Sequence, residues 1–314
     1  MDQHRFNITH PSNTMLSVVS GLLGAVGVPG NTLLICLILS DYKKRKAHEW
    51  LLFCLAFGDL MLCLNNLFLE SVFITRFDEP LCKLAGGLDY GLGMLAFFTP
   101  PVVMYNRYLA LHNSQKCARV FTNRNVAVIW TGLLLFSFSF IIPFAAGDSL
   151  GQDDLGLCGT QVSNWKLAAV QIFMEAICVI ITVISVYLCY KVVTKIRNHK
   201  REAVTRSQLQ SRLIDESREL IIVMSIIAAL PLITAVPPAL LKLIQSFSTQ
   251  FDLWLTRSLI APFPLIPASN AYITIYVVKD YRKMVVRLFK KFTQPSTPVI
   301  TVSLHNSSGR GAGS

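Results

Sequence analysis

Residues 104–110 read MYNRYLA, and they place one arginine, Arg107, among apolar residues. The stretch LAFFTPPVVM occupies 95–104 before it, and YLAL occupies 108–111 after it. Burying an unpaired guanidinium in a protein core is costly, because an ionised group loses its hydration there. Arg107 is therefore expected either to lie near an aqueous boundary or to serve a function that justifies the burial.

The chain around this stretch is unusually apolar. Of its 314 residues 53% are hydrophobic and 15% charged, and the mean hydropathy is +0.50, whereas soluble domains carry about 25% charge. A helix needs about 20 apolar residues to cross the hydrocarbon of a bilayer. The sequence therefore predicts an all-α fold, a seven-transmembrane helix bundle, with apolar runs at roughly 15–40, 50–74, 82–110, 126–146, 166–190, 219–244 and 256–278.

The basic residues predict how the bundle is oriented. Most of the 29 lysines and arginines fall between the first and second runs, after the third, between the fifth and sixth, and after the seventh. Cytoplasmic segments carry this excess, so the N-terminus is expected outside and the C-terminus inside, in a multi-pass protein of the plasma membrane. The net charge of +11 is then a membrane signature, and no nucleic-acid partner is expected, since no soluble basic face is present.

The sequence divides into four parts. Residues 1–14 form a polar extracellular N-terminus with a glycosylation sequon at Asn7, and residues 15–278 form the transmembrane domain. Residues 279–292, KDYRKMVVRLFKKF, place apolar and basic residues on opposite helical faces, which predicts a short amphipathic interfacial helix bound to lipid of the inner leaflet. Residues 293–314 are expected to be a disordered cytoplasmic tail.

Two of the eight cysteines fall outside the membrane on the extracellular side. Cys82 begins the third run, and Cys158 lies in the loop between the fourth and fifth runs. The exterior is oxidising, so the sequence predicts a disulfide between Cys82 and Cys158. Such a bond would hold that loop over the mouth of the bundle.

The spacing of several polar residues resembles that of rhodopsin-like G-protein-coupled receptors. Asp59 follows Asn31 by 28 residues, and Arg107 follows Cys82 by 25, which are the family's intervals. Asn106, Arg107 and Tyr108 occupy the place of the family's Asp-Arg-Tyr motif. Further marker positions are matched by Trp130, Asn270 and Tyr281. The resemblance covers residues from about 20 to 290.

The chain also departs from the family's pattern. Asn106 replaces an acidic residue, Ala271 replaces the proline of the Asn-Pro-x-x-Tyr motif, and Thr274 replaces its tyrosine. The sixth run lacks the aromatic-x-Pro pattern. The Asn-Arg-Tyr sequence and the ending ITIYVVKDYRK at 273–283 are similar to nematode serpentine chemoreceptors of the Str, Srh and Srd kind.

The resemblance implies a role for Arg107 in coupling to the G protein, together with Asn106 and Tyr108. The competing interpretation is an arginine that only reaches toward the membrane interface. Because Asn106 is uncharged, the arginine lacks its usual neighbouring carboxylate. Either another carboxylate holds it, with Asp215 and Glu219 as candidates, or basal activity is raised.

Asp59 is an ionisable residue in the middle of a predicted span, and such residues are functional candidates. The resemblance implies a sodium ion at Asp59, with Asn270 as a contributor, although Ala96 stands where a serine is usual. The alternative is structural, with Asp59 hydrogen-bonded to Asn31 and Asn270. No other metal and no cofactor are expected.

Three further acidic residues are candidates for a ligand pocket. Asp89 lies five helical turns before Arg107, hence on the same face, and in amine receptors an aspartate there pairs with the ligand's ammonium group. Glu70 and Glu175 lie near the outer half of the second run and within the fifth. Each of the three can instead be a polar residue that is hydrogen-bonded internally.

The favoured function is a receptor, with a chemosensory role preferred, that converts binding of an extracellular small molecule or peptide into activation of a heterotrimeric G protein. A transporter or a ligand-gated channel is the alternative, but no internal repeat, charge ring or filter loop is visible. An enzyme is not expected, because the chain has neither an H-E-x-x-H nor a G-x-S-x-G motif.

Overall fold

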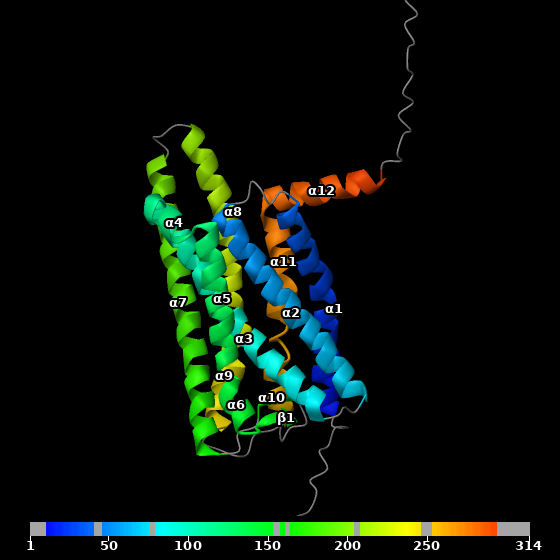
Figure 1. Ribbon diagram of the computed structural model, residues 1–314. Coiled ribbons are helices and arrows are strands. Elements are labelled where there is room, and N and C mark those ends of the chain that lie inside the picture. The colour runs from blue at the N-terminus through cyan, green and yellow to red at the C-terminus, as the bar shows by residue number, and fades with distance from the viewer. Residues whose placement is uncertain are drawn as a thin grey trace, which may run out of the picture.

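The computed structural model describes residues 11–40, 46–75, 79–152, 158–160, 164–203, 208–245 and 253–293, and within this part it forms a bundle of long helices (Figure 1). Seven of its segments are long and apolar enough to cross a membrane, as the sequence predicted. Asn7 and the tail beyond Thr293 lie outside the described residues.

Four of the seven spans are continuous helices, and they tolerate internal proline and glycine. They are α1 (Pro11–Leu39), α2 (Ala47–Thr75), α3 (Glu79–His112) and α7 (Trp165–Ala203). Pro29 lies inside α1, and Pro100 and Pro101 lie inside α3. The first span begins at Pro11, four residues earlier than its apolar run.

The other three spans are each built from two helices that meet at a break. The pairs are α5 (Asn123–Ser139) with α6 (Ile142–Ala146), α8 (Gln208–Thr234) with α9 (Val236–Gln245), and α10 (Leu253–Ile260) with α11 (Leu265–Val277). Each break lies beside proline, which lacks the N–H needed for the helical hydrogen bond and clashes with the preceding turn.

Two short helices lie at the same end of the bundle as the C-terminal ends of α1 and α3 (Figure 1). Helix α4 (Ser114–Val120) begins after Asn113, whose side chain accepts a hydrogen bond from the backbone N–H of Lys116. Helix α12 (Lys279–Thr293) follows α11 after Val278, which has an extended conformation and turns the chain.

A hairpin covers the opposite end of the bundle (Figure 1). Strands β1 (Leu150–Gln152) and β2 (Cys158–Thr160) pair antiparallel, and a disulfide joins Cys158 to Cys82 of α3. Strand β2 approaches α3 closely at Gly86 of α3, where an added Cβ would lie 2.6 Å from the backbone nitrogen of Gly159. The disulfide and this glycine together fix the hairpin over the bundle mouth.

The last span is joined to the first by a buried arginine. Arg257 of α10 has no exposed surface, and its Nε–H donates a 2.8 Å hydrogen bond to Asn13 Oδ1 of α1. Its bond to Asn13 is one of the contacts that close the ring of helices.

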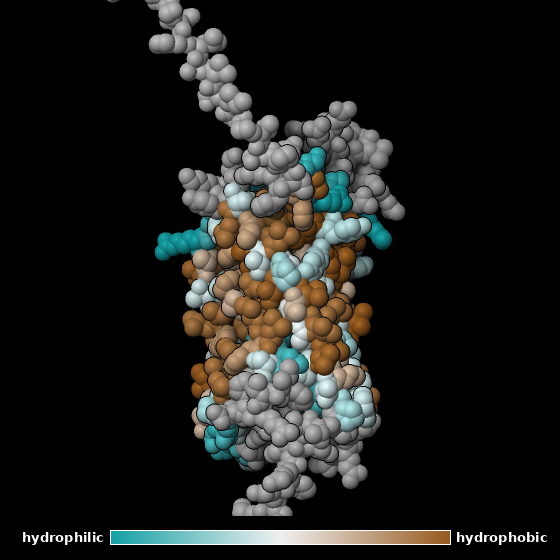
Figure 2. Space-filling model, turned by 90° about the vertical axis from the view of Figure 1, so that its right-hand side faces the viewer, coloured by the Kyte–Doolittle hydropathy of each residue, from teal (hydrophilic) through white to brown (hydrophobic). Residues whose placement is uncertain are grey.

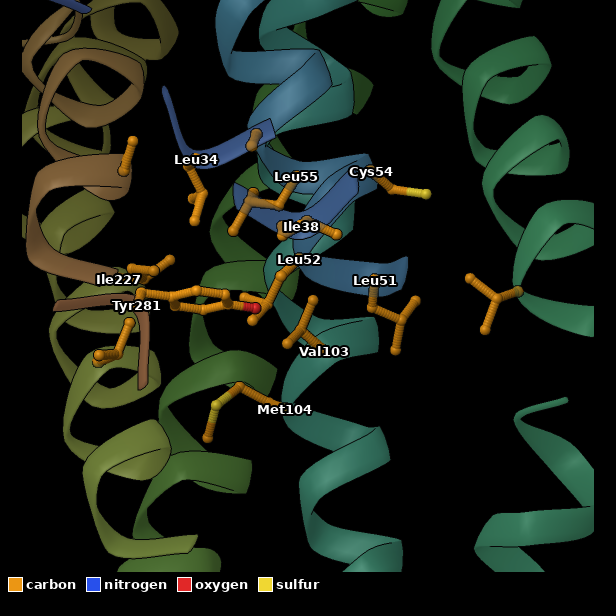
Figure 3. Packing of buried hydrophobic residues seen from close by; sticks show 14 of the residues in the cluster. Leu34, Ile38, Leu51, Leu52, Cys54, Leu55, Val103, Met104, Ile227 and Tyr281 are labelled. Atoms are coloured by element: carbon orange, nitrogen blue, oxygen red, sulfur yellow. The ribbon is translucent and has the colours of Figure 1, made fainter. Parts of the chain in front are cut away.

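The apolar core is densest toward the end where α12 lies. One cluster joins Leu34 and Ile38 of α1, Leu52 of α2 and Val103 of α3 with Tyr281 of α12, whose ring points toward Leu52 (Figure 3). Figure 2 shows apolar residues dominating the middle of one outer face and hydrophilic residues toward its ends. This pattern fits a bundle with a lipid-facing belt.

Candidate functional site

The Asn-Arg-Tyr segment lies near the last turns of α3, at the same end of the bundle as α4 and α12. The Asn106 side chain is buried and donates to Cys117 Sγ of α4 over 3.5 Å, and the Cys117 thiol donates back to the Asn106 carbonyl over 3.6 Å. Tyr108 stacks on His112, with ring centroids 5.4 Å apart. Asn106 thus anchors α4 and does not pair with Arg107.

Arg107 keeps hydrogen-bonding capacity that the structure leaves unused. Its Nε and Nη2 atoms are buried and have no hydrogen-bond partner. Of the two alternative carboxylate partners expected from the sequence, Glu219 bonds instead to Lys279, and the Asp215 side chain lies outside the described residues. These two guanidinium nitrogens are therefore able to donate to an acceptor from outside the chain, once one reaches them.

Cys117 is a thiol at this end of the bundle, on α4. Burial raises the pKa of the Cys117 thiol, and the nearby positive charge of Arg107 lowers it by less. The thiol is therefore protonated at neutral pH, in keeping with its role as a hydrogen-bond donor to the carbonyl of Asn106.

A second polar cluster lies in the middle of the bundle, between α1, α2 and α11. Asn270 Nδ2 donates to Asp59 Oδ2 over 2.9 Å, and Thr274 donates to the Asn270 carbonyl over 2.8 Å. Asn31 Nδ2 donates to the carbonyls of Pro267 and Gly27 over 2.9 and 3.0 Å. The amide of Asn31 thus bonds to α11 backbone, while Asp59 is bonded by Asn270.

This cluster contains oxygens of the kind that a sodium ion binds. The atoms Asp59 Oδ1, Asn31 Oδ1 and Asn270 Oδ1 are all buried oxygens without a hydrogen-bond partner, and hard cations prefer carboxylate and carboxamide oxygens. In the described part of the chain, no group of three His, Cys, Asp or Glu side chains is placed to hold another kind of metal. The residues present therefore fit sodium.

A cavity of about 150 Å³ opens between α3, α7, the α8–α9 break and the α10–α11 break. Asp89 of α3 and Glu175 of α7 both line it. The remaining lining is mostly apolar and aromatic, with Tyr90, Phe97, Met94, Met174, Cys178 and Phe263 among its members. Two acidic side chains predicted for a pocket are therefore brought into one cavity.

Gln171 is a polar residue beside this cavity that the sequence analysis did not single out. Its Nε2 donates to Glu175 Oε1 over 2.7 Å, while its Oε1 accepts from the Tyr90 hydroxyl over 3.1 Å and from Thr160 over 3.4 Å. Gln171 therefore links the hairpin, α3 and the carboxylate of Glu175. The spacing of Gln171 and Glu175, one helical turn apart, is the only trace of this network in the sequence.

Glu70 is placed away from the cavity. Its carboxylate accepts a hydrogen bond from Ser17 of α1, and its side chain packs against Gly21. The expectation that Glu70 belongs to the ligand pocket does not match this position, because the side chain faces α1 and not the interior of the bundle. Its contact with Ser17 is one that holds α1 to α2.

The hairpin above the cavity carries one exposed ion pair. Lys83 Nζ of α3 lies 2.7 Å from Asp148 Oδ1, just before β1, and 2.8 Å from Glu79 Oε1. The hydrogen bond and charge of Lys83 hold the pKa of the Asp148 carboxyl below its ordinary value. The pair helps the Cys82–Cys158 disulfide to keep the hairpin on α3.

Comparison with known proteins accounts for these features together. The family described as 7 transmembrane receptor (rhodopsin family) matches residues 30–271. The chain belongs to this rhodopsin family of seven-transmembrane receptors. Membership makes it a multi-pass membrane protein, and the family is one of receptors and not of enzymes.

Individual relatives of the receptor are distant. It is 25% identical over 139 residues to the G-protein coupled receptor moody of Drosophila melanogaster, covering 43% of this chain and 21% of that protein. It is 22% identical over 249 residues to somatostatin receptor type 1 of Rattus norvegicus, covering 77% and 63%. The chain thus spans about a fifth of the first relative's length and less than two thirds of the second's.

A solved structure supports the fold. The crystal structure of squid rhodopsin matches with a TM-score of 0.75 at 16% sequence identity, over 88% of this chain and 85% of that one. At this identity the match speaks for the arrangement of the helices alone. The ligand of this receptor has to be inferred from its own residues.

Proposed function

We propose that this receptor is chemosensory, that it binds a compact cationic molecule from outside the cell, and that it activates a heterotrimeric G protein. The observation that carries the ligand class is the meeting of Asp89 and Glu175 in one cavity. Two carboxylates in a mostly apolar site favour a cation, and the aromatic lining residues Tyr90, Phe97 and Phe263 are of the kind that attracts cations.

The size of the cavity favours a small molecule over a peptide. A volume of about 150 Å³ is close to that of an engineered cavity that holds benzene, and it is below the roughly 300–1,000 Å³ of most ligand pockets. A small amine, or a lipophilic odorant with an amino group, suits this space. The peptide alternative would require the hairpin to move away from α3.

The chemosensory role and the kinship with nematode serpentine chemoreceptors rest on sequence. The Asn106-Arg107-Tyr108 segment and the ending ITIYVVKDYRK carry that resemblance. The relatives described above come from fly, mammal and squid, so the subfamily remains part of this proposal. A receptor that detects small environmental amines would agree with both the acidic cavity and the resemblance to chemoreceptors.

Signal transfer follows from a shift between two populations. We infer that the N-terminus lies outside, because the basic residues gather at the end of the bundle where α4 and α12 lie. A ligand that binds the active arrangement more tightly moves the equilibrium by its difference in affinity. The unpartnered Nε and Nη2 of Arg107 then donate to acceptors of the G protein.

Helix α12 would lie on the inner leaflet while this happens. Val286, Leu288 and Phe289 are exposed apolar side chains on it, and its basic residues suit anionic lipid headgroups. Membrane lipid is therefore a proposed partner of this helix. The division into an extracellular N-terminus, a transmembrane domain, this helix and a cytoplasmic tail belongs to the same proposal.

The test is second-messenger output in cells that express wild type, Arg107→Ala or Arg107→Lys at matched surface levels. Lysine keeps the positive charge at the membrane boundary but lacks the planar guanidinium. We expect Arg107→Ala to lose the basal and amine-evoked signal and Arg107→Lys to retain only a small part of it. Full activity of Arg107→Lys, or an unchanged signal in Arg107→Ala, would make Arg107 an interfacial anchor and overturn the coupling role.

A further inference from the structure

The part of α8 just before its membrane-spanning segment is tied to the start of α12 by one carboxylate. Glu219 Oε1 lies 2.7 Å from Lys279 Nζ, and Glu219 Oε2 accepts a hydrogen bond from the backbone N–H of Lys279 over 2.9 Å. Both oxygens of Glu219 thus engage the same residue, 60 positions further along the chain. The Glu219 side chain is 18% exposed and that of Lys279 58%, so water reaches the lysine side of the ion pair.

The backbone half of this contact is more than a surface ion pair. Lys279 is the first residue of α12, and the first N–H groups of a helix have no partner inside it. A carboxylate placed there satisfies such a group and interacts favourably with the helix dipole. Glu219 of α8 therefore acts as a cap for α12, and α12 cannot separate from α8 without losing that cap.

Besides the Glu219–Lys279 pair, α8 and α12 share an apolar cluster. Tyr281 of α12, two residues after Lys279, and Ile227 of α8 belong to one buried apolar cluster (Figure 3). The unpartnered guanidinium atoms of Arg107 lie at the same end of the bundle, and Glu219 is not bonded to them. Within the described residues the polar contacts of Glu219 hold α8 to α12 and not to α3.

We propose that the Glu219–Lys279 contact is a resting-state tether, which holds the cytoplasmic half of α8 against the anchored helix α12 and opens when the receptor activates. The proposal rests on the proposed G-protein coupling for its functional meaning. The start of α12 thus supplies the restraint on the sixth span. Helix α3 does not supply it, because Asn106 is uncharged and Arg107 has no acidic neighbour there.

The first measurement is basal second-messenger output at matched surface levels. Glu219→Gln removes the charge, and we expect it to raise basal output about three- to tenfold, the range for losing a charged hydrogen bond that is partly exposed. Lys279→Ala keeps the backbone N–H and should give a smaller rise. Lys166→Ala removes a lysine charge at the start of α7, at the opposite end of the bundle, and should leave the output unchanged.

The second measurement does not involve a G protein. Hydrogen exchange of the purified receptor reports opening at the backbone amides of 219–230 and at the start of α12. We expect faster exchange in Glu219→Gln at both places and wild-type exchange in Lys166→Ala. The exchanged pair Glu219→Lys with Lys279→Glu restores the side-chain attraction but not the cap. Its exchange rate should therefore lie between those of Glu219→Gln and wild type.

The two measurements separate the tether from the function on which it rests. Faster exchange without a change in output supports the tether and contradicts the coupling function. Unchanged exchange in Glu219→Gln overturns the tether, whatever the output does. Should Glu219→Gln fail to reach the surface, the exchanged pair and Lys279→Ala decide by the same criteria.

Discussion

A single amide at position 106 changes what the neighbouring arginine is able to do. A carboxylate one residue before Arg107 would accept from its guanidinium and hold it along α3, but Asn106 bonds to Cys117 instead. The guanidinium consequently keeps two buried nitrogens without acceptors. Leaving buried donors unsatisfied costs roughly 1–3 kcal/mol or more for charged groups, which favours any state that supplies an acceptor.

A carboxylate at position 106 should therefore lower the basal output of the receptor. In Asn106→Asp the new oxygens accept from Arg107, and we expect basal output to fall about three- to tenfold, as for a charged hydrogen bond gained. Asn106→Leu, which loses the bond to Cys117 without adding charge, is the matched control and should not fall. Equal output of Asn106→Asp and wild type would mean that Arg107 is not free to pair along α3.

The thiol that Asn106 contacts gives a pH-dependent test of the same geometry. Since burial raises the pKa of Cys117, the reactive thiolate is scarce at pH 7 and forms only as the pH rises past the ordinary thiol value. In a receptor with Cys36 and Cys189 replaced by serine, a water-soluble maleimide should label Cys117 slowly at pH 7 and faster above about pH 9. Rapid labelling at pH 7 would show that packing of α4 against Asn106 of α3 does not shield this thiol.

At the scale of an element, α1 is shaped by four glycines spaced three residues apart. Added Cβ atoms at Gly24 and Gly27 would lie 2.8 Å from the Cys63 carbonyl and 2.3 Å from Cys63 Sγ, and one at Gly30 would lie 2.6 Å from the Tyr272 ring. The fourth, Gly21, faces Glu70 at 3.0 Å. Because small residues let helix backbones approach closely in membranes, this stripe sets the contact of α1 with α2 and α11.

Substitution within the stripe should therefore destabilise the bundle. Gly27→Ala meets Cys63 Sγ and the Ala268 backbone, and overpacking of this kind costs about 1–3 kcal/mol. Gly132→Ala on α5 is the matched control, because nothing lies within 4 Å of its added Cβ, and helix propensity alone favours it by about 0.5–1 kcal/mol. Thermal unfolding in detergent checks both. A Gly27→Ala receptor as stable as Gly132→Ala would exclude tight packing at this stripe.

The helices themselves were predictable because lipid imposes a strong local rule. Seven apolar runs matched seven candidate spans, and the amphipathic pattern after 279 matched α12. The break between α8 and α9 followed the prolines at 231 and 237, although its location at Ala235 depends on packing. The hairpin was not predicted, since three-residue strands carry too little pattern to be seen.

Polar contacts between helices were harder to predict than the helices. Asp89 and Glu175 share a cavity as their positions suggested, whereas Glu70 faces α1, because rotation of a helix by a fraction of a turn decides which neighbour a side chain meets. The Glu219–Lys279 contact spans 60 residues, and no local pattern marks it. Pairs of this kind depend on the tertiary arrangement, which spacing alone does not give.

At the scale of the whole molecule, three polar sites lie at successive depths of the bundle. Asp89 and Glu175 line the cavity beneath the hairpin, Asp59 lies in the central cluster, and Arg107 lies near the opposite end. Helix α3 carries the first and the last of these. A change at Asp89 or at Arg107 therefore acts on the same helix, which is a route by which a small molecule in the cavity would bias the distant end.

The central cluster predicts a sodium dependence of stability. An ion that binds only the folded resting state stabilises it in proportion to the logarithm of its concentration above the dissociation constant. We expect the thermal unfolding midpoint to be higher in NaCl than in choline chloride of equal ionic strength, and Asp59→Asn to abolish that difference. Glu70→Gln, which removes another carboxylate of α2 outside the cluster, should preserve it. The same midpoint in both salts, or the same sodium effect in Asp59→Asn, would leave Asp59 as a structural acceptor for Asn270, because three unpartnered oxygens would then be tolerated without an ion.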